Sequence, residues 1–257
     1  MAMASRLLWL RLRNTPILQQ LRLEEALFRA DKRSWFVTNE WDVAPGLKPK
    51  AAEAIVLGIS GKVAEMVEAE RAAHAQVPVI KRFTGGGTIV CDADTLFASF
   101  IVGEGMLPQV QPYPDPILQW TGEVYSDALA ACGASGFSVN ANDYCIGQLK
   151  FGGNAQAISG KRWLHHTSLL WQFEPERMGL LKMPPRQPEY RKGRAHGDFV
   201  RGLGHSLADR DAFCAALAAA VSARLPLQEV SLQEAEAIAK LPHRAVTTLV
   251  DLQSPGK

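Results

Sequence analysis

The sequence lacks a long hydrophobic run, since no stretch of consecutive apolar residues reaches the ~18 that a membrane-spanning helix requires. It also lacks an excess of charge, because 28 Lys and Arg residues face 26 Asp and Glu residues and leave a formal net charge of +2. So small a balance, without a long basic run, gives no electrostatic reason to bind nucleic acid. We therefore expect a soluble protein whose partners include neither a membrane nor a nucleic acid.

Cysteine is scarce as well, and its four positions form neither a C-x-x-C pair nor a zinc-type spacing with histidine. We interpret these cysteines as reduced thiols of an intracellular protein, located in the cytoplasm or in mitochondria. They are Cys91, Cys132, Cys145 and Cys214.

The N-terminal region allows two interpretations. No acidic residue precedes Glu24, whereas four arginines do, which is the composition of a mitochondrial transit peptide. Residues 7–12 and 21–30, however, have the patterns of a strand and of a helix that belong to the fold. Cleavage of a presequence therefore stays open.

What is present is the profile of an ordinary globular protein, with 257 residues of which 47% are hydrophobic and 21% charged. A chain of this length buries about 70–75% of the surface of its unfolded state, so its core needs no disulfide or structural metal. Helical spacing predicts helices over residues 17–29, 62–75, 116–131, 209–225 and 232–240. Short β-rich runs predict strands over residues 7–12, 34–38, 54–59, 77–82, 88–91, 96–102, 137–139, 144–151, 162–171 and 245–252.

These elements predict an α/β (α+β) fold, in which a mixed and mainly antiparallel sheet is flanked by helices. We expect residues 1–204 to form one domain, and residues 205–257 to form a helical C-terminal extension packed on it. The pair Gly152-Gly153 and the residues around Gly160 are expected in turns.

The first candidate site is a glycine run that follows a predicted strand, Arg82-Phe83-Thr84-Gly85-Gly86-Gly87-Thr88. Consecutive glycines let backbone N–H groups point at a ligand, and the forked guanidinium of Arg82 suits a phosphate or a carboxylate. The run is no P-loop, because it lacks the G-K-[ST] ending and a strand follows it. Taken alone, such residues more often form a β-hairpin turn.

The second candidate centres on Lys150, which follows Asn142-Asp143 and precedes a second glycine pair. A lysine near the end of a strand that faces a glycine turn can lie against a phosphate and an acyl carbonyl, where it stabilises the charge of an acyl transfer. Without further information, a solvated strand lysine is the more common case.

The third candidate is the pair His165-His166 in a predicted strand. Neighbouring strand residues point to opposite faces, so the two imidazoles cannot easily bind one metal ion, and we expect at least one to line a pocket or support the core. A Ser/His/Asp triad is not favoured either, because no G-x-S-x-G elbow occurs.

These three segments, in this order and at these separations, resemble the catalytic domain shared by lipoate–protein ligase A, biotin protein ligase and octanoyltransferases. The resemblance covers residues 7–203. The glycine run resembles the acyl-group and nucleotide loop of that family, and Lys150 falls at the position of its essential lysine, within Lys-x-x-Gly-x-Ala. The implied fold is a biotin/lipoate ligase-like catalytic domain.

The resemblance also implies a chemistry. ATP with Mg²⁺ activates a fatty acid, lipoate or octanoate, to an acyl-adenylate, and the acyl group then passes to a lysine of a lipoyl-domain acceptor protein. The implied catalytic residue is Lys150, which binds the phosphate and the acyl carbonyl, and Asp143 is the implied Mg²⁺ ligand. The residues implied to bind substrate or nucleotide are Arg82, Gly85, Gly86, Gly87, Thr88, Asn142, Asp143, Gly153, Asn154, Ala155 and His166.

Several alternatives stay open at this point. Full-length ligases of the family often carry an additional C-terminal domain that aids adenylation, whereas about fifty residues follow Gly204 here. The chain activates its acid without that domain, a partner supplies it, or the protein is an ATP-independent octanoyl- or lipoyltransferase. Such transferases use a cysteine nucleophile, and no cysteine lies between Lys150 and Cys214. A non-catalytic module that binds an acyl group or a nucleotide is disfavoured by the cations Arg82 and Lys150. Lipoate, octanoate and biotin remain open as the acyl group.

A group of basic residues near the end of the resemblance is a candidate acceptor surface, since an acidic lipoyl domain would be attracted to it. A solvated basic face is an equally good interpretation. The group comprises Arg186, Arg191, Lys192, Arg194 and Arg201.

Overall fold

The structure, a computed structural model, describes residues 6–44, 47–184 and 187–252 of the chain. Its strands are β1 (Leu7–Arg13), β2 (Trp35–Glu40), β3 (Ala54–Leu57), β4 (Val79–Lys81), β5 (Ile89–Cys91), β6 (Thr95–Val102), β7 (Phe137–Asn140), β8 (Asp143–Ile146), β9 (Leu149–Ser159), β10 (Arg162–Leu170), β11 (Leu227–Val230) and β12 (Thr248–Val250). Its α-helices are α1 (Ile17–Ala30), α2 (Val63–Met66), α3 (Ala69–His74), α4 (Pro114–Ala131), α5 (Pro175–Met178), α6 (His196–Phe199), α7 (Arg210–Ser222) and α8 (Leu232–Ala239). Short 3₁₀ helices are η1 (Lys50–Ala52), η2 (Glu189–Arg191) and η3 (Leu203–His205).

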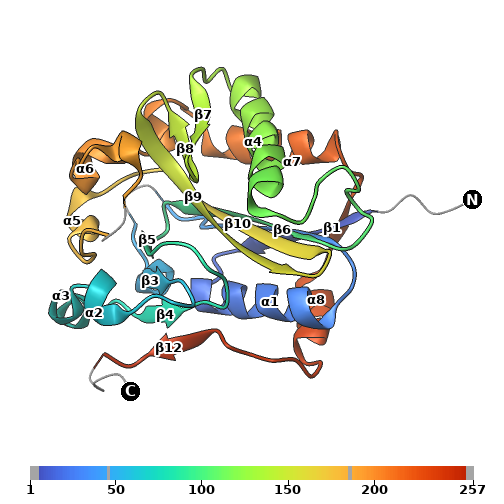
Figure 1. Cartoon of the computed structure of the whole chain (residues 1–257), viewed down its shortest axis with the longest axis horizontal. Coiled ribbons are helices and arrows are strands. Elements are labelled where there is room, and N and C mark those ends of the chain that lie inside the picture. The colour runs from blue at the N-terminus through green and yellow to red at the C-terminus, as the bar shows by residue number, and fades with distance from the viewer. Residues whose placement is uncertain (1–5, 45–46, 185–186, 253–257) are drawn as a thin grey trace, which may run out of the picture.

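A large sheet with the strand order β11-β1-β2-β6-β10-β9-β8-β7 forms the centre of the fold. β1 is parallel to both of its neighbours, β2 and β11, whereas the other neighbouring pairs in this sheet are antiparallel. Helices α4 and α7 cover one face, and α1 and α8 cover the other (Figure 1). The predicted fold class, a mixed and mainly antiparallel sheet flanked by helices, is confirmed.

Alternation along the strands supplies a core to each face of the large sheet. In β1, Leu7 belongs to the core beneath α4 and α7, while Leu8 and Leu10 belong to the core beneath α1. Successive strand side chains point to opposite faces, so one apolar run can serve both cores. β6 is buried at every position, as expected for a central strand that is covered on both sides.

Helix α1 is unusual because its buried face carries polar residues. Gln20, Glu24 and Glu25 are each at most 1% exposed. A buried carboxylate is costly unless it is hydrogen-bonded, so such residues are kept only where the fold or the site uses them. Gln20 and Glu24 take part in the candidate site, and Glu25 binds the C-terminal segment.

A smaller sheet packs against α1, with the strand order β12-β4-β3-β5. β3 lies between β4 and β5, parallel to the first and antiparallel to the second. The glycine run therefore crosses from one side of β3 to the other, and its interpretation as a β-hairpin turn is wrong. The crossing is close, because a Cβ atom on Gly58 would lie 2.4 Å from the carbonyl oxygen of Gly86.

The helix predicted over residues 62–75 is interrupted. It consists of α2 and α3, which are separated at Val67 because this residue is extended and forms a β-bridge with Leu181. Val67 is 1% exposed and packs on the smaller sheet. Burial of this one apolar side chain by a distant segment thus overrides the local helical pattern.

The strand predicted over residues 144–151 is also divided. It comprises most of β8 and the start of β9, which turn at Gly147, a glycine with a φ of +60°. The pair Gly152-Gly153, expected in a turn, lies inside β9. The turn expected around Gly160 is present and joins β9 to β10.

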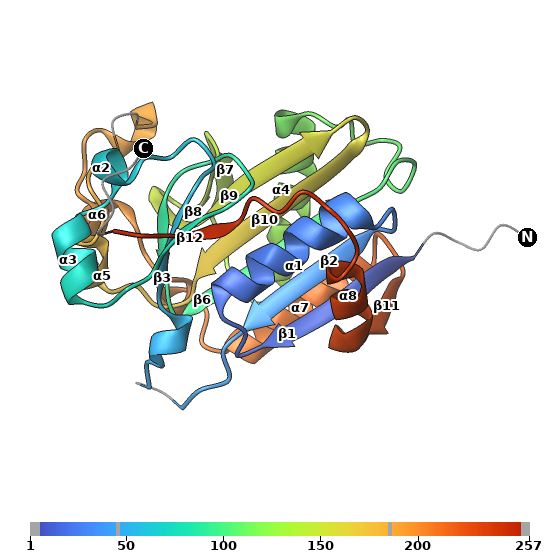
Figure 2. The same ribbon diagram turned by 90° about the horizontal axis from the view of Figure 1, so that it is seen from below.

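The C-terminal segment adds a strand to each sheet. β11, which the sequence pattern did not predict, pairs with β1 (Figure 2), and β12 pairs with β4 (Figure 1). Glu25 fastens this segment to α1, because its carboxylate accepts hydrogen bonds from the backbone N–H groups of Val246 and Thr247 at 2.9–3.1 Å. Among the described helices, none has the length and apolar character needed to cross a membrane.

Candidate active site

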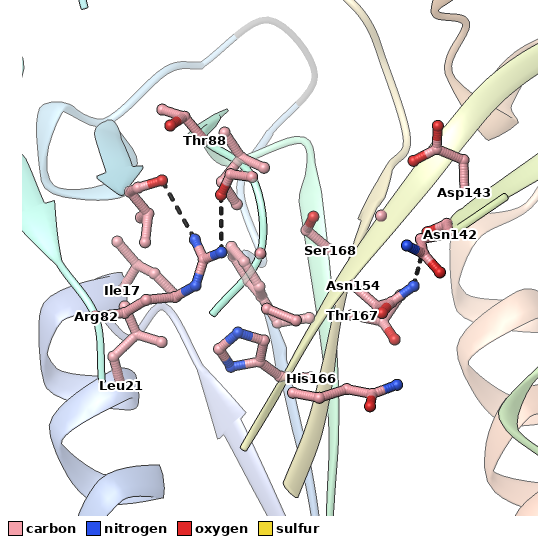
Figure 3. Close-up of a pocket in the computed structure, with 18 of the residues that line it drawn as sticks. Ile17, Leu21, Arg82, Thr88, Asn142, Asp143, Asn154, His166, Thr167 and Ser168 are labelled. Atoms are coloured by element: carbon pink, nitrogen blue, oxygen red, sulfur yellow. Dashed lines mark hydrogen bonds between the residues drawn. The ribbon is translucent and has the colours of Figure 1, made fainter. Parts of the chain in front are cut away.

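A cavity of about 380 Å³ lies between the glycine run, α1 and strands β6, β9 and β10. One end of its wall is apolar, with Ile17, Leu21, Val56 and Phe97. Asn142, Asp143 and Asn154 lie at the opposite, polar end (Figure 3). Lys150 lines the same cavity, and its ammonium pairs with Asp143. The predicted residues that line the cavity are Arg82, Gly86, Gly87, Thr88, Asn142, Asp143, Lys150, Gly153, Asn154, Ala155 and His166. Sites of this kind bind small molecules that have an apolar body and a polar end.

Arg82 supports the glycine run from beneath. Its side chain is buried, and Nη2 donates to the carbonyl oxygens of Gly85 and Gly87, each at 2.7 Å. Nε donates to Thr84 Oγ1 at 2.8 Å. Burial lowers the pKa of Arg82 to about 10, although the nearby Glu24 carboxylate acts in the opposite direction, so the guanidinium stays charged at neutral pH. Most of its N–H groups thus hold the loop, and a direct contact of Arg82 with a ligand stays a prediction.

The three glycines have different environments. Gly86 has a φ of +93°, and a Cβ atom there would lie 2.8 Å from Arg82 Nη2 and 2.9 Å from Ala155 Cβ. A Cβ atom on Gly85 or Gly87 would meet nothing within 4 Å. Gly86 therefore sets the shape of the run. Gly86 and Gly87 line the cavity, whereas Gly85 does not, and its N–H donates to the carbonyl oxygen of Gln156 at 3.3 Å.

His166 and Glu24 connect the glycine run to α1. His166 Nδ1 lies 3.0 Å from Glu24 Oε2, and Nε2 lies 3.2 Å from Thr84 Oγ1. Because an ionised carboxylate can only accept, we assign the proton to Nδ1, and Nε2 then accepts from the Thr84 hydroxyl. Thr84 in turn accepts from Arg82. One chain of hydrogen bonds thus joins the two buried groups Arg82 and Glu24.

Sequence reasoning missed Glu24 and its partners. Glu24 Oε1 accepts hydrogen bonds from Gln20 Nε2 and Ser99 Oγ, each at 2.7 Å. A signal was present, because Gln20 and Glu24 lie three and seven residues after Ile17, on the apolar stripe of the predicted helix. Polar residues on that stripe indicate a buried network.

Lys150 is paired across β8 and β9. Its Nζ lies 2.6 Å from Asp143 Oδ1, and the other carboxylate oxygen, Oδ2, accepts a hydrogen bond from the Tyr190 hydroxyl at 2.8 Å. The lysine side chain is 29% exposed. It is thus a partly buried, paired ammonium in a cavity wall, unlike a freely solvated strand lysine.

An irregularity in β9 determines where Lys150 points. Tyr144 pairs with Gly152 but Cys145 pairs with Lys150, so β9 has one extra residue at this position. A β-bulge shifts the alternation of side chains by one, which places Lys150 on the same face as Gly153. A Cβ atom on Gly153 would lie 3.3 Å from Lys150 Nζ, so the glycine leaves room for the ammonium.

A second cavity, of about 230 Å³, adjoins the first. Its wall includes Lys182, Arg191 and His196. Burial lowers the pKa of His196, and the charges of Arg191 and Lys150 lower it further. The residues that line both cavities are Gly87, Thr88, Ile89, Asp143, Lys150, Gly153 and Ser168. Lys150 therefore lies at the junction of two cavities, each of which has both apolar and charged residues in its wall.

Residues 188–201, here called the strap, cover this junction. The strap carries η2 and α6, and its Arg201 N–H donates to the carbonyl oxygen of Lys150 at 2.9 Å. Arg194 Nη2 donates to the carbonyl oxygens of Tyr190 and Gln148 at 3.0 and 3.2 Å. These contacts hold the strap against the loop between β8 and β9.

The predicted basic surface is smaller than expected, because two of its residues make contacts within the strap and against the neighbouring backbone. Arg191 is buried, with its guanidinium 4.7 Å from the ring centre of Phe199, and Arg194 donates only to backbone carbonyls in its hydrogen bonds within the described residues. Lys192 and Arg201 are exposed. Arg186 lies outside the described residues.

The two histidines have the opposite orientations that alternation predicts. His165 is fully buried on the α4 side, where Nε2 lies 2.9 Å from the Tyr144 hydroxyl. Burial lowers the pKa of His165 to about 3, and His166 acts in the same direction. His165 therefore supports the core as a neutral imidazole, while His166 faces the cavity.

The cysteines lack an activating environment. Burial raises the pKa of all four thiols, to about 12 for Cys91, and neighbouring carboxylates raise all four further. At Cys145 the Tyr190 hydroxyl and the charges of Lys150 and Arg194 act in the opposite direction, but the pKa is still raised. Cys145 pairs with Lys150 in the sheet but is itself fully buried. A thiolate nucleophile is thus disfavoured at each position.

A comparison with protein families explains this combination of fold and site. The model of the lipoyl protein ligase A/B catalytic domain matches residues 16–221. The chain belongs to this family. The match begins just before α1 and ends within α7, so it includes the glycine run, Lys150 and the strap, while β11, α8 and β12 follow it.

Individual relatives of this family member are distant. It is 26% identical over 238 residues to inactive lipoate–protein ligase 2 of Plasmodium falciparum, and covers 62% of that protein with 75% of its own chain. It is 27% identical over 134 residues to lipoate–protein ligase 1 of Staphylococcus aureus. This match covers 51% of the present chain and 38% of the relative. This lipoyl ligase family chain therefore spans less than two thirds of the length of either relative.

Solved structures share its fold. A lipoate–protein ligase A bound with ATP superposes with a TM-score of 0.72 at 18% identity and covers 93% of each chain. A bipartite lipoate protein ligase of Thermoplasma acidophilum gives a TM-score of 0.72 at 17% identity and covers 93% of this chain and 91% of the other.

Proposed function

We propose that this protein is a lipoate–protein ligase, which activates lipoate or octanoate with ATP and transfers the acyl group to a lysine of a lipoyl domain. The observation that carries the proposal is the position of Lys150 at the junction of the two cavities. The apolar end of the first cavity would hold an acyl chain, and the basic groups Lys182, Arg191 and His196 of the second would face phosphates. The acid and the nucleotide would then meet at the Lys150 ammonium. One solved relative is bound with ATP, and another contains lipoic acid.

Each step of this reaction needs positive charge at the junction. In the first step a carboxylate oxygen of the acid attacks the α-phosphorus of ATP, and the bond to pyrophosphate breaks. In the second step the acceptor amine attacks the acyl carbonyl, and AMP leaves. Lys150 would stabilise the negative charge on the phosphate and on the carbonyl oxygen, and backbone N–H groups of Gly86 and Gly87 would assist.

Magnesium would enter with the nucleotide. Among the described residues, no group of three or more His, Cys, Asp or Glu side chains could hold a metal ion. Mg²⁺ usually uses one or two protein carboxylates together with phosphate oxygens and water, and neutralises phosphate charge there. The single carboxylate of Asp143 in the cavity wall fits this mode, and we propose it as the ligand. Asn142, Asn154 and Thr88 would orient the nucleotide.

The acceptor would be a lipoyl domain, as in the solved structure of the Thermoplasma ligase with its E2 lipoyl domain. Its lysine would have to reach Lys150 through the opening of the cavities. Lys192 and Arg201 are the exposed basic residues of the strap that could attract an acidic domain.

An alternative has support from one relative. The Plasmodium protein that covers 75% of this chain is named as an inactive ligase, so a module that binds substrates without activating them is the second candidate. An ATP-independent transferase with a cysteine nucleophile is less well supported, because burial raises the pKa of every thiol.

The test is ATP–pyrophosphate exchange by the purified protein, with lipoate, octanoate and biotin supplied separately. We expect exchange with lipoate or octanoate, and a loss of about 10²–10³-fold in the variant Lys150→Ala, as found when one stabilising donor is removed from a charged transition state. Lys192→Ala is the matched control, because Lys192 is exposed. Binding of the acid without exchange would favour the non-catalytic module.

A further inference from the structure

The ammonium of Lys150 is bound by the carboxylate of Asp143, and that carboxylate is fixed by a second partner. Asp143 lies between two partners, with Lys150 on Oδ1 at 2.6 Å and the Tyr190 hydroxyl on Oδ2 at 2.8 Å. A lysine side chain has four rotatable bonds and loses about 1.5–2 kcal/mol of rotamer freedom when it is fixed. An aspartate that could rotate freely would fix it poorly. With each oxygen bonded to a different element, the carboxylate has one orientation.

Tyr190 is well placed to fix that orientation. It belongs to η2 of the strap, and its ring centre lies 5.2 Å from that of Phe199. Its carbonyl oxygen accepts from Arg194. The ring is therefore held on its face and through its backbone, which leaves the hydroxyl in a defined position.

The strap holds Lys150 at both ends. Its Arg201 N–H binds the lysine carbonyl oxygen, and Val200 forms a β-bridge with Lys150. Through Asp143, Tyr190 holds the ammonium as well. Tyr190 lines neither of the two cavities. Its hydroxyl has two neighbours, Asp143 Oδ2 at 2.8 Å and Cys145 Sγ at 3.4 Å, and of these it is Asp143 that contacts the Lys150 ammonium.

We propose that Tyr190 is a positioning residue, whose hydroxyl orients Asp143 and thereby places the Lys150 ammonium at the junction of the two cavities. The kinetic consequence rests on the proposed function, whereas the structural one does not. Removal of the hydroxyl frees the carboxylate to rotate, and the lysine then samples several rotamers. Fewer molecules have the ammonium in place at the moment of reaction, so kcat falls while the acid still binds at the apolar end of the first cavity.

The test uses Tyr190→Phe in the full chain, which keeps the ring and removes the hydroxyl. Tyr125→Phe is the matched control, since Tyr125 lies in the core beneath α4 and lines neither cavity. With carbon-13-labelled lysine, NMR relaxation gives the order parameter of the Lys150 ε-methylene, assigned by its loss in Lys150→Arg. We expect it to fall into the flexible range, below about 0.6, in Tyr190→Phe only. The exposed Lys192 is the internal reference.

Pyrophosphate exchange supplies the second measurement, made where circular dichroism shows every variant to be fully folded. We expect kcat to fall about tenfold in Tyr190→Phe with an unchanged KM for the acid. An unchanged order parameter would overturn the proposal, and so would a lower order parameter with an unchanged kcat. If the wild-type protein shows no exchange with any acid, the proposed function fails, and the order parameter alone still decides whether Tyr190 positions Lys150.

Discussion

Buried polar residues hold the glycine run at the scale of single side chains. Glu24 and Arg82 are 0% and 3% exposed, and Thr84 and His166 link them through hydrogen bonds. A charge left unpaired in a core costs several kcal/mol, so loss of any one of these hydrogen bonds would destabilise the groups on either side of it. This part of the cavity wall is therefore expected to be rigid before any ligand binds.

Gly86 is the residue of the run that tolerates a side chain least. We expect Gly86→Ala to destabilise the protein by about 1–3 kcal/mol, because it combines a positive φ with close contacts to Arg82 and Ala155. Gly85→Ala, where a Cβ atom meets nothing within 4 Å, should cost less than about 1 kcal/mol. Urea unfolding at neutral pH measures both, and equal losses would contradict the assignment of Gly86 as the tight point.

His165 should make the protein sensitive to acid. Its pKa is lowered from 6.5 to about 3, mainly by burial, and His166 acts in the same direction. Between these values the unfolded chain binds a proton that the folded protein does not, so stability falls as the pH drops below 6.5. We expect a loss of about 2 kcal/mol from this group between pH 7 and pH 5.

Urea unfolding at pH 7, 6 and 5 checks this expectation. The variant His165→Gln should lose that part of the pH dependence, whereas the exposed His205→Gln should keep it. A wild-type slope that survives in His165→Gln would show that another group titrates.

The site residues differ in how far the sequence revealed them. The sequence revealed the glycine run, Asp143 and Lys150. Each belongs to a short motif that can be read locally, and the motifs occur in the order found in the family. Tyr190 and the pairing of Asp143 with Lys150 were not recognised, since they depend on a β-bulge and on a strap that returns from about forty residues away. A β-bulge shifts the alternation of side chains by one residue, and no pattern of residue types in the sequence indicates it.

Elements were predicted well where one periodicity extends over many residues. α1, α4, α7 and β6 fall close to their predicted ranges. Predictions failed where contact with a distant segment determines the local conformation. Val67, for example, is extended because it forms a β-bridge with Leu181. β11 was missed because a four-residue edge strand with exposed positions has little pattern of its own.

The C-terminal strand depends on one carboxylate of α1. We expect Glu25→Ala to cost about 3 kcal/mol, because it leaves the N–H groups of Val246 and Thr247 and the side chain of Arg29 without their partner. Hydrogen exchange at the amides of residues 246–250 should become much faster than in the wild-type protein.

The matched control is Glu234→Ala in α8. Its ion pair with Arg33 joins side chains that are 41% and 44% exposed, so its loss should cost less than about 1 kcal/mol. If both variants lose the same stability, Glu25 does not fasten the C-terminal segment.

The whole molecule combines two sheets around one junction. The large sheet supplies β9 and β10, the smaller sheet supplies the glycine run, and α1 fills the angle between them. The sequence predicted the fold class but not that the strands form two sheets, because strand order depends on pairings between distant residues. The elements that follow the family match are β11, α8 and β12. β11 and β12 each add an edge strand to one sheet, and α8 packs on α1.

The measurement that tests the central claim most directly is mass spectrometry of a lipoyl domain incubated with this protein, lipoate and ATP. We predict that one lysine of the domain gains a lipoyl group and that this product is absent without ATP. The variant Lys150→Ala should form only a trace of the product. Modification that proceeds without ATP from an acylated donor would contradict the account and identify a transferase, and no modification under any of these conditions would identify a binding module.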